Sequence, residues 1–143
     1  APPGVSVYLD YAHTPDGLKK VLETISEFPH RRIILVFGCR GNRDRGKRSV
    51  MGQVAERYAD VIILTSDNPA FEDPQDIARD ITAKIRKAPI FLADRHTAIH
   101  YALTEAQPGD IVLITGKGRE NYQLTGNTVI PYSDAHAVET WLQ

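Results

Sequence analysis

Short runs of apolar residues recur along the chain, and each is followed by a longer stretch whose apolar positions lie three or four residues apart. The runs are rich in Val, Ile and Leu, which is typical of strands buried on both faces of a parallel sheet. They lie at residues 5–9, 33–37, 61–64, 90–92 and 111–114. Two more runs, 122–124 and 128–130, flank a Thr-Gly-Asn turn and predict a small hairpin.

The helical stretches carry recognisable start signals. Thr14 is a good N-cap, and Pro15 suits the first helical position after it. Asp73-Pro74 opens a third helix, and Asp94 can cap a fourth. We therefore expect four strand–helix units, followed by a fifth strand, the hairpin and a last helix.

The apolar spacing also predicts the extent and the buried face of each helix. The second helix is predicted over residues 49–58, Ile85 on the inner face of the third helix, and Ala135 on that of the last. The order of elements predicts an α/β fold: one doubly wound, Rossmann-like domain over residues 1–143. It should have about six strands, mostly parallel with an antiparallel edge, and helices on both faces.

Composition narrows the class of protein. Of the 143 residues, 42% are hydrophobic and 24% are charged, as in soluble globular domains. A net charge of −1 argues against a general nucleic-acid binder. The single cysteine excludes an internal disulfide and fits a reducing compartment. No apolar stretch approaches the roughly 20 residues that span a bilayer, and nothing resembles a metal site because the histidines are scattered.

The start of the chain suggests an excised domain. It begins Ala-Pro-Pro-Gly, enters a strand almost at once, and has Met51 as its only methionine. We expect further chain upstream of this domain boundary. A processed mature chain is the alternative.

The loop at residues 38–48 is the most informative stretch. It follows a buried strand, contains three glycines, and has one acid, Asp44, against five basic residues. The basic residues are Arg40, Arg43, Arg45, Lys47 and Arg48. Ligands of such sheets bind at the carboxyl ends of the strands, and this loop suits a carboxylate or a phosphate. The alternative is a solvated charged loop. Cys39 is interpreted as a small packing residue.

Three more polar loops are predicted at the same edge of the sheet. Asp10 and His13 lie in the turn after the first strand, where they could meet a nucleotide, a metal-bound water or a proton in transfer, or serve only as turn residues. Residues 65–70 are rich in turn formers. Residues 115–120 contain part of a phosphate-loop pattern whose full form is absent.

Four motifs in this order resemble a known family. They are Asp-Tyr-Ala-His-Thr-Pro-Asp at 10–16, Gly-Cys-x-Gly-x-Arg-Asp-x-Gly-Lys-Arg at 38–48, Ser-Asp-Asn-Pro at 66–69 and Gly-Lys-Gly-x-Glu at 116–120. Over essentially the whole chain they are similar to the C-terminal domain of the Mur ligases, most closely the MurE type. The resemblance implies an ATP- and Mg²⁺-dependent ligase of peptidoglycan synthesis. ATP would phosphorylate the D-glutamate side chain of UDP-N-acetylmuramoyl-L-alanyl-D-glutamate, and the amine of a diamino acid would attack the acyl phosphate.

The resemblance also implies roles for individual residues. Arg43 would bind a carboxylate of the incoming amino acid, and Asp10 and His13 would approach ATP when the domains close. The remaining amino-acid site would be formed by Asp67, Asn68, Pro69, Ala70, Gly116 and Glu120.

No catalytic residue is expected in this chain, because the UDP-binding and ATPase domains of the family lie upstream. The chain alone is therefore expected to be inactive. Its partners would be the UDP-muramoyl dipeptide, the diamino acid and its own upstream domains, in a cytoplasmic and monomeric protein without membrane or nucleic-acid partners.

Ala70 bears on the choice of amino acid. Members that add meso-diaminopimelate carry Asp-Asn-Pro-Arg, and that arginine clamps the distal carboxylate with two hydrogen bonds. Alanine cannot do this, so the resemblance favours L-lysine, which lacks that carboxylate. A different arginine, Arg40 or Arg119, reaching the same space would leave meso-diaminopimelate open.

Other functions stay open. Within the family the substrate could be meso-diaminopimelate or ornithine, and the wider superfamily includes folylpolyglutamate and cyanophycin synthetases. A different class is a stand-alone, flavodoxin-like nucleotide-binding module without catalysis. A nucleic-acid binder is the most distant alternative.

Overall fold

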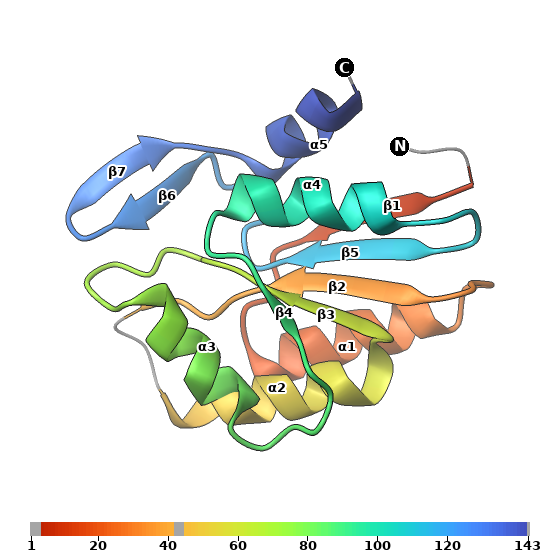
Figure 1. Ribbon diagram of the computed structural model, residues 1–143, viewed down its shortest axis with the longest axis horizontal. Coiled ribbons are helices and arrows are strands. Elements are labelled where there is room, and N and C mark those ends of the chain that lie inside the picture. The colour runs from red at the N-terminus through yellow and green to blue at the C-terminus, as the bar shows by residue number, and fades with distance from the viewer. Residues whose placement is uncertain (1–3, 42–44, 143) are drawn as a thin grey trace.

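The computed structural model describes residues 4–41 and 45–142. Within these ranges, five parallel strands form the main sheet in the spatial order β1-β5-β2-β3-β4 (Figure 1). The strands are β1 (Ser6–Asp10), β2 (Ile33–Phe37), β3 (Val61–Leu64), β4 (Ile90–Phe91) and β5 (Ile111–Thr115). The predicted α/β class and mostly parallel sheet are confirmed. Strands β2 and β5 are buried along their whole length, which explains their unbroken apolar runs.

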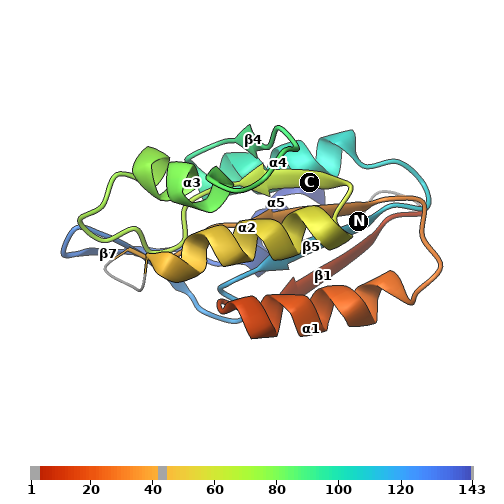
Figure 2. The same ribbon diagram turned by 90° about the horizontal axis from the view of Figure 1, so that it is seen from below.

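Helices cover both faces of the sheet. They are α1 (Pro15–Ser26), α2 (Gly46–Tyr58), α3 (Pro74–Thr82), α4 (Arg95–Glu105) and α5 (Asp134–Leu142). Helices α1, α2 and α3 lie on one face, and α4 and α5 lie on the other (Figures 1 and 2). Their apolar side chains form one core on each face. Among the described residues, no helix is both long and apolar enough to cross a membrane.

The predicted helix starts are confirmed by their caps. The side chain of Thr14 accepts a hydrogen bond from the Gly17 amide, and Asp94 accepts one from the Thr97 amide. Asp73 does the same for α3, so each cap satisfies an amide that the first helical turn leaves unpaired.

Three details of the helices differ from prediction. Helix α2 begins three residues earlier, at Gly46, because Arg48 is a buried first-turn residue rather than a loop residue. Helix α3 ends at Thr82, and Ile85 packs against the core from the turn beyond it. In α5 the buried alanine is Ala137, whereas Ala135 is exposed. The buried carboxylate of Asp134, the first residue of α5, sets this rotation.

The predicted hairpin is present as β6 (Tyr122–Thr125) and β7 (Thr128–Pro131). It forms a separate two-stranded antiparallel sheet rather than an edge of the main sheet. The hairpin lies beyond the carboxyl ends of the main strands (Figure 1), where Thr125 forms an isolated bridge with Ala70. It therefore pairs with the loop after β3 and not with a strand.

Candidate functional site

The four polar loops meet at one edge of the sheet, as predicted. Strand β1 runs in register with β5, so Asp10 pairs with Thr115 at the carboxyl ends of both. Strand β2 is in register with β3, so Phe37 pairs with Leu64. Because all these strands are parallel, the loops that follow them open side by side.

The loop after β3 contains an unusual turn at residues 68–70, which we call the Asn68 turn. Asn68 and Ala70, on either side of Pro69, have positive φ angles of 45° and 54°. Asparagine tolerates this left-handed region, but alanine does so only when its surroundings hold it there. Hydrogen bonds to the hairpin supply that support: the Ala70 amide donates to the Leu124 carbonyl at 3.2 Å, and its carbonyl accepts from Gly126 at 2.6 Å.

Four charged side chains form what we call the inner charge cluster: Arg40, Asp67, Lys117 and Glu120. Arg40 Nη2 lies 2.8 Å from Glu120 Oε2, and its Nε lies 3.6 Å from Asp67 Oδ2. Lys117 Nζ lies 3.3 Å from Asp67 Oδ1 and 3.9 Å from Glu120 Oε1. The side chains of Asp67 and Lys117 are fully buried, whereas Glu120 is 14% exposed. Glu120 is therefore the acid of the cluster that a ligand can reach.

Lys117 also joins the surrounding segments. Its Nζ donates to Asn68 Oδ1 at 2.9 Å and to the Tyr122 carbonyl at 3.1 Å. Burial lowers the pKa of Lys117, and the neighbouring Asp67 carboxylate opposes that shift. The lysine thus ties the β3 loop to the β5 loop and the hairpin from inside the protein.

A second ion pair lies behind this cluster. Arg95, the first residue of α4, forks onto Asp134 with distances of 2.7 Å and 2.8 Å, and both side chains are at most 1% exposed. The Tyr132 hydroxyl donates to the same carboxylate at 2.9 Å. Burial and the charge of Asp134 raise the pKa of Tyr132, so this hydroxyl keeps its proton.

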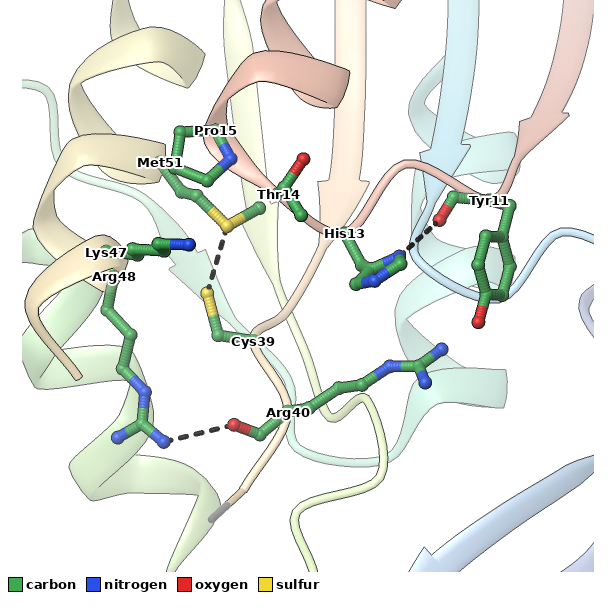
Figure 3. A pocket seen from close by; sticks show the side chains of 9 residues that line it. All are labelled: Tyr11, His13, Thr14, Pro15, Cys39, Arg40, Lys47, Arg48 and Met51. Atoms are coloured by element: carbon green, nitrogen blue, oxygen red, sulfur yellow. Dashed lines mark hydrogen bonds between the residues drawn. The ribbon is translucent and has the colours of Figure 1, made fainter. Parts of the chain in front are cut away.

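A cavity of about 310 Å³ opens between the β1–α1 turn and the β2–α2 loop (Figure 3). Its lining includes the basic side chains of Arg40, Lys47 and Arg48, and no acidic side chain of the described residues. Such a cavity suits a carboxylate or a phosphate. Figure 3 also shows Cys39 pointing toward Met51, with the two sulfur atoms 3.5 Å apart. Burial raises the pKa of Cys39 to about 12, which agrees with its interpretation as a packing residue.

Most of the predicted amino-acid site lies together. Residues 67–70 face the loop that carries Gly116 and Glu120, and Asn68 Nδ2 lies 3.4 Å from Glu120 Oε1. A side chain on Gly116, whose φ is 114°, would collide with the Asp67 carboxylate. Arg43 lies outside the described residues.

The two predicted nucleotide residues lie in the turn after β1, where Asp10 adjoins Gly116 and His13 faces the basic cavity. Asp10 accepts the Ala12 amide at 2.8 Å, and its carbonyl accepts the Gly116 amide at 3.0 Å. His13 is exposed at the rim of the basic cavity, and its Nδ1 lies 3.1 Å from the Tyr11 carbonyl (Figure 3).

Sequence reasoning named Asp67 as a site residue but missed three other buried charged residues, Lys117, Arg95 and Asp134. Arg95 and Asp134 gave no signal, since each stands at a helix start where polar residues are common. Arg48 did give one. It falls on the inner stripe of α2 with Met51 and Ala55, and an arginine in an apolar stripe indicates a buried partner. Arg48 has two half-buried carboxylate partners: Glu72, at 2.8 Å and 2.9 Å, and Asp80, at 2.9 Å.

The family model described as "Mur ligase, glutamate ligase domain" matches residues 1–118. This chain belongs to that family. The predicted resemblance to the Mur ligases is thereby confirmed.

Two relatives of this Mur ligase domain carry the same name. A protein of Chromobacterium violaceum, named UDP-N-acetylmuramoyl-L-alanyl-D-glutamate–2,6-diaminopimelate ligase, is 51% identical over 136 residues, covering 93% of this chain and 28% of the relative. A protein of the same name from Geobacillus kaustophilus is 50% identical over 133 residues, with 90% and 27% coverage. The chain thus spans little more than a quarter of the curated relatives that it matches.

A solved structure of a ligase with that name superposes on this Mur ligase domain with a TM-score of 0.94 and 41% identity. The match covers 99% of this chain and 30% of the other. The α/β architecture and the hairpin therefore belong to a fold already seen within a longer ligase.

Proposed function

We propose that this chain is the amino-acid-binding domain of an ATP-dependent ligase that joins a diamino acid to UDP-N-acetylmuramoyl-L-alanyl-D-glutamate. The observation that carries the proposal is the convergence of Asn68, Gly116 and Glu120 around a strained, hairpin-supported turn. The shared name of the relatives supports the reaction. The UDP-binding and ATPase parts would lie in the rest of the protein.

The chemistry of the site suits a diamino acid. Glu120 presents a partly exposed carboxylate, which can pair with an ammonium group, and Asn68 adds an amide close to it. Arg43 in the basic loop would fork onto a carboxylate. The domain would act mainly by holding the amine next to the acyl phosphate, since positioning alone supplies a large part of such a rate enhancement.

The nucleotide would approach from the side of the basic cavity. His13 lines this cavity, and Asp10 directly precedes Tyr11, which also lines it. Both would meet ATP when the domains close, and Lys47 would supply positive charge for the phosphates. Mg²⁺ would be held mainly outside this chain. We further propose that the intact protein is cytoplasmic and monomeric.

For the amino acid we propose 2,6-diaminopimelate. Eight relatives that are 46–51% identical all carry that substrate in their names. The L-lysine preference drawn from Ala70 finds no support among them. Ala70 is only 9% exposed beneath the hairpin and cannot bind a carboxylate through its side chain. We propose that Arg40, whose guanidinium lies among Gly116, Asp67 and Glu120, replaces the missing clamp.

A substrate panel tests this proposal. The intact protein receives ATP, Mg²⁺ and the UDP-muramoyl dipeptide, with meso-diaminopimelate, L-lysine and L-ornithine offered separately while phosphate release is followed. We expect turnover with meso-diaminopimelate, and an Arg40→Ala variant should lose it selectively. Turnover with lysine alone would overturn the choice of amino acid but keep the ligase. No turnover with any of the three would overturn the proposed function.

A further inference from the structure

Arg95 stands in a place that helix physics does not favour. It is the first residue of α4, directly after the cap Asp94, and a cation at a helix N-terminus is opposed by the helix dipole. It is also only 2% exposed, although burying a guanidinium requires several well-placed partners. The reason for its position must therefore lie in what its side chain contacts.

Two of those contacts are backbone carbonyls at the site. Arg95 Nη1 donates to the Ser66 carbonyl at 3.1 Å, and Nη2 donates to the Thr115 carbonyl at 2.9 Å. Ser66 comes just before Asp67 in the loop after β3, and Thr115 comes just before Gly116 in the loop after β5. One planar guanidinium thus bridges the roots of the two loops that form the amino-acid site.

The remaining contacts hold the guanidinium itself. Its Nε and Nη2 fork onto Asp134, whose carboxylate is completely buried and also accepts the Tyr132 hydroxyl. Tyr132 and Asp134 follow the hairpin directly, so the orientation of Arg95 is linked to the element that supports the Asn68 turn. A fork of this kind fixes direction as well as distance, which a lysine at the same position could not do.

We propose that Arg95 is a positioning residue for the amino-acid site: it sets the spacing between the Asn68 turn and the Gly116–Glu120 loop. This inference rests on the proposed function, and it assigns a role to a residue that touches no substrate. Its consequence is selective. A change in the spacing of these two loops should weaken binding of the substrate held between them. The UDP-muramoyl dipeptide and ATP would bind largely elsewhere.

The test compares Arg95→Lys with Arg32→Lys in the intact protein. Arg32 also pairs with a buried carboxylate: it lies 2.8 Å from Asp110, which Arg31 contacts as well, and it reaches the Glu105 carbonyl. It precedes β2 at the opposite edge of the sheet, so Arg32→Lys controls for the loss of an arginine–aspartate pair away from the site. For Arg95→Lys we expect the KM for the diamino acid to rise about tenfold or more, with the KM values for ATP and the UDP substrate unchanged within about twofold. Arg32→Lys should leave all three KM values unchanged.

A milder variant covers the case in which Arg95→Lys does not fold. Tyr132→Phe removes only the hydroxyl contact to Asp134 and should raise the KM for the diamino acid in the same selective way, by less. Equal losses for all three substrates, or the same kinetic profile in Arg32→Lys, would overturn the positioning role while leaving the ligase intact. A wild-type protein that turns over no diamino acid would instead overturn the proposed function and this inference with it.

Discussion

Single residues of the site have conformations that their neighbours must hold in place. The Ala70 φ of 54° costs roughly 1 kcal/mol or more for a residue with a Cβ. Main-chain bonds to Leu124 and Gly126 offset this cost. Strained residues of this kind are concentrated at ligand sites, which supports the proposed role of the turn.

Gly116 should tolerate no side chain. Its φ of 114° disfavours any other residue, and an added Cβ would also collide with the Asp67 carboxylate. We expect Gly116→Ala to lower the free energy of unfolding by about 3 kcal/mol or more, since backbone strain and overpacking each cost about 1–3 kcal/mol. Urea denaturation measures this.

The matched control is Gly126→Ala. Gly126 also has a positive φ, 62°, but the nearest atom that an added Cβ would meet is 3.6 Å away. Gly126→Ala should therefore lower the free energy of unfolding by only about 1–2 kcal/mol, the cost of the left-handed backbone alone. Equal losses in the two variants would show that the Asp67 carboxylate moves aside at no cost.

The buried thiol of Cys39 should make stability depend on pH. Its pKa is raised from 9.0 to about 12 because burial disfavours the thiolate. Between these values the unfolded chain loses a proton that the folded chain keeps, so stability falls as pH rises, by up to about 1.4 kcal/mol per pH unit. Urea denaturation between pH 8 and 11 should show a steeper decline for wild type than for Cys39→Ala. Parallel curves would mean that the thiol ionises freely in the folded protein.

At the level of helices and strands, the sequence predicts well whatever depends on local chemistry. Unbroken Ile, Val and Leu runs marked β2 and β5, because strands covered on both faces need apolar residues at every position. Side-chain caps marked the starts of α1, α3 and α4. The rotation of α5 was not predictable, since it depends on Asp134 meeting an arginine 39 positions away in the chain.

The candidate site likewise has a part that local sequence patterns predict and a part that they do not. Its four loops could be placed at one edge, because parallel strands present their carboxyl ends together. Apart from Arg48, which lies on the apolar stripe of α2, the charges that would be buried could not be predicted. Lys117 stood in a glycine-rich, phosphate-like motif, yet it is fully buried and bonded to Asn68. Such pairings depend on distances between loops that no local pattern encodes.

The hairpin and the Asn68 turn should behave as one unit. Asn68 Oδ1 accepts from the Leu124 amide and from Lys117 Nζ, each at 2.9 Å. Asn68→Gly keeps the positive φ but leaves the Leu124 amide without this acceptor and removes one of the partners of Lys117, which should cost about 1–3 kcal/mol. Amide exchange measured by NMR should accelerate at Leu124, by about tenfold for each 1.4 kcal/mol of local stability that is lost.

Thr128→Ala serves as the control for this experiment. Thr128 is exposed on β7 and pairs with Thr125 beside the turn of the hairpin. Removing the Thr128 side chain beyond Cβ should leave the rate of amide exchange at Leu124 unchanged. If Asn68→Gly also leaves that exchange unchanged, the hairpin is held by its own strand pairing and not by the turn.

As a whole, the domain brings together a charge-balanced interior and an open basic rim. The inner charge cluster pairs two cations with two anions, and Arg95 with Asp134 adds one of each sign. The rim, in contrast, presents the basic side chain of Lys47 to a cavity. We infer that the paired charges of the interior hold the loops in place. The rim would bind anionic groups of the rest of the protein and of the proposed nucleotide.

The isolated 143-residue chain should therefore fold but not catalyse. The proposed reaction needs an ATP site and a UDP-substrate site, and this chain spans only 27–28% of the two relatives described above. With ATP, Mg²⁺, the UDP-muramoyl dipeptide and meso-diaminopimelate, we expect no phosphate release above background, while the intact protein at equal concentration releases phosphate steadily. Circular dichroism of the same sample should confirm that the chain is folded, so that inactivity is not mistaken for unfolding. Phosphate release by the folded chain alone, lost in a Glu120→Gln variant, would show that the domain carries catalytic groups of its own.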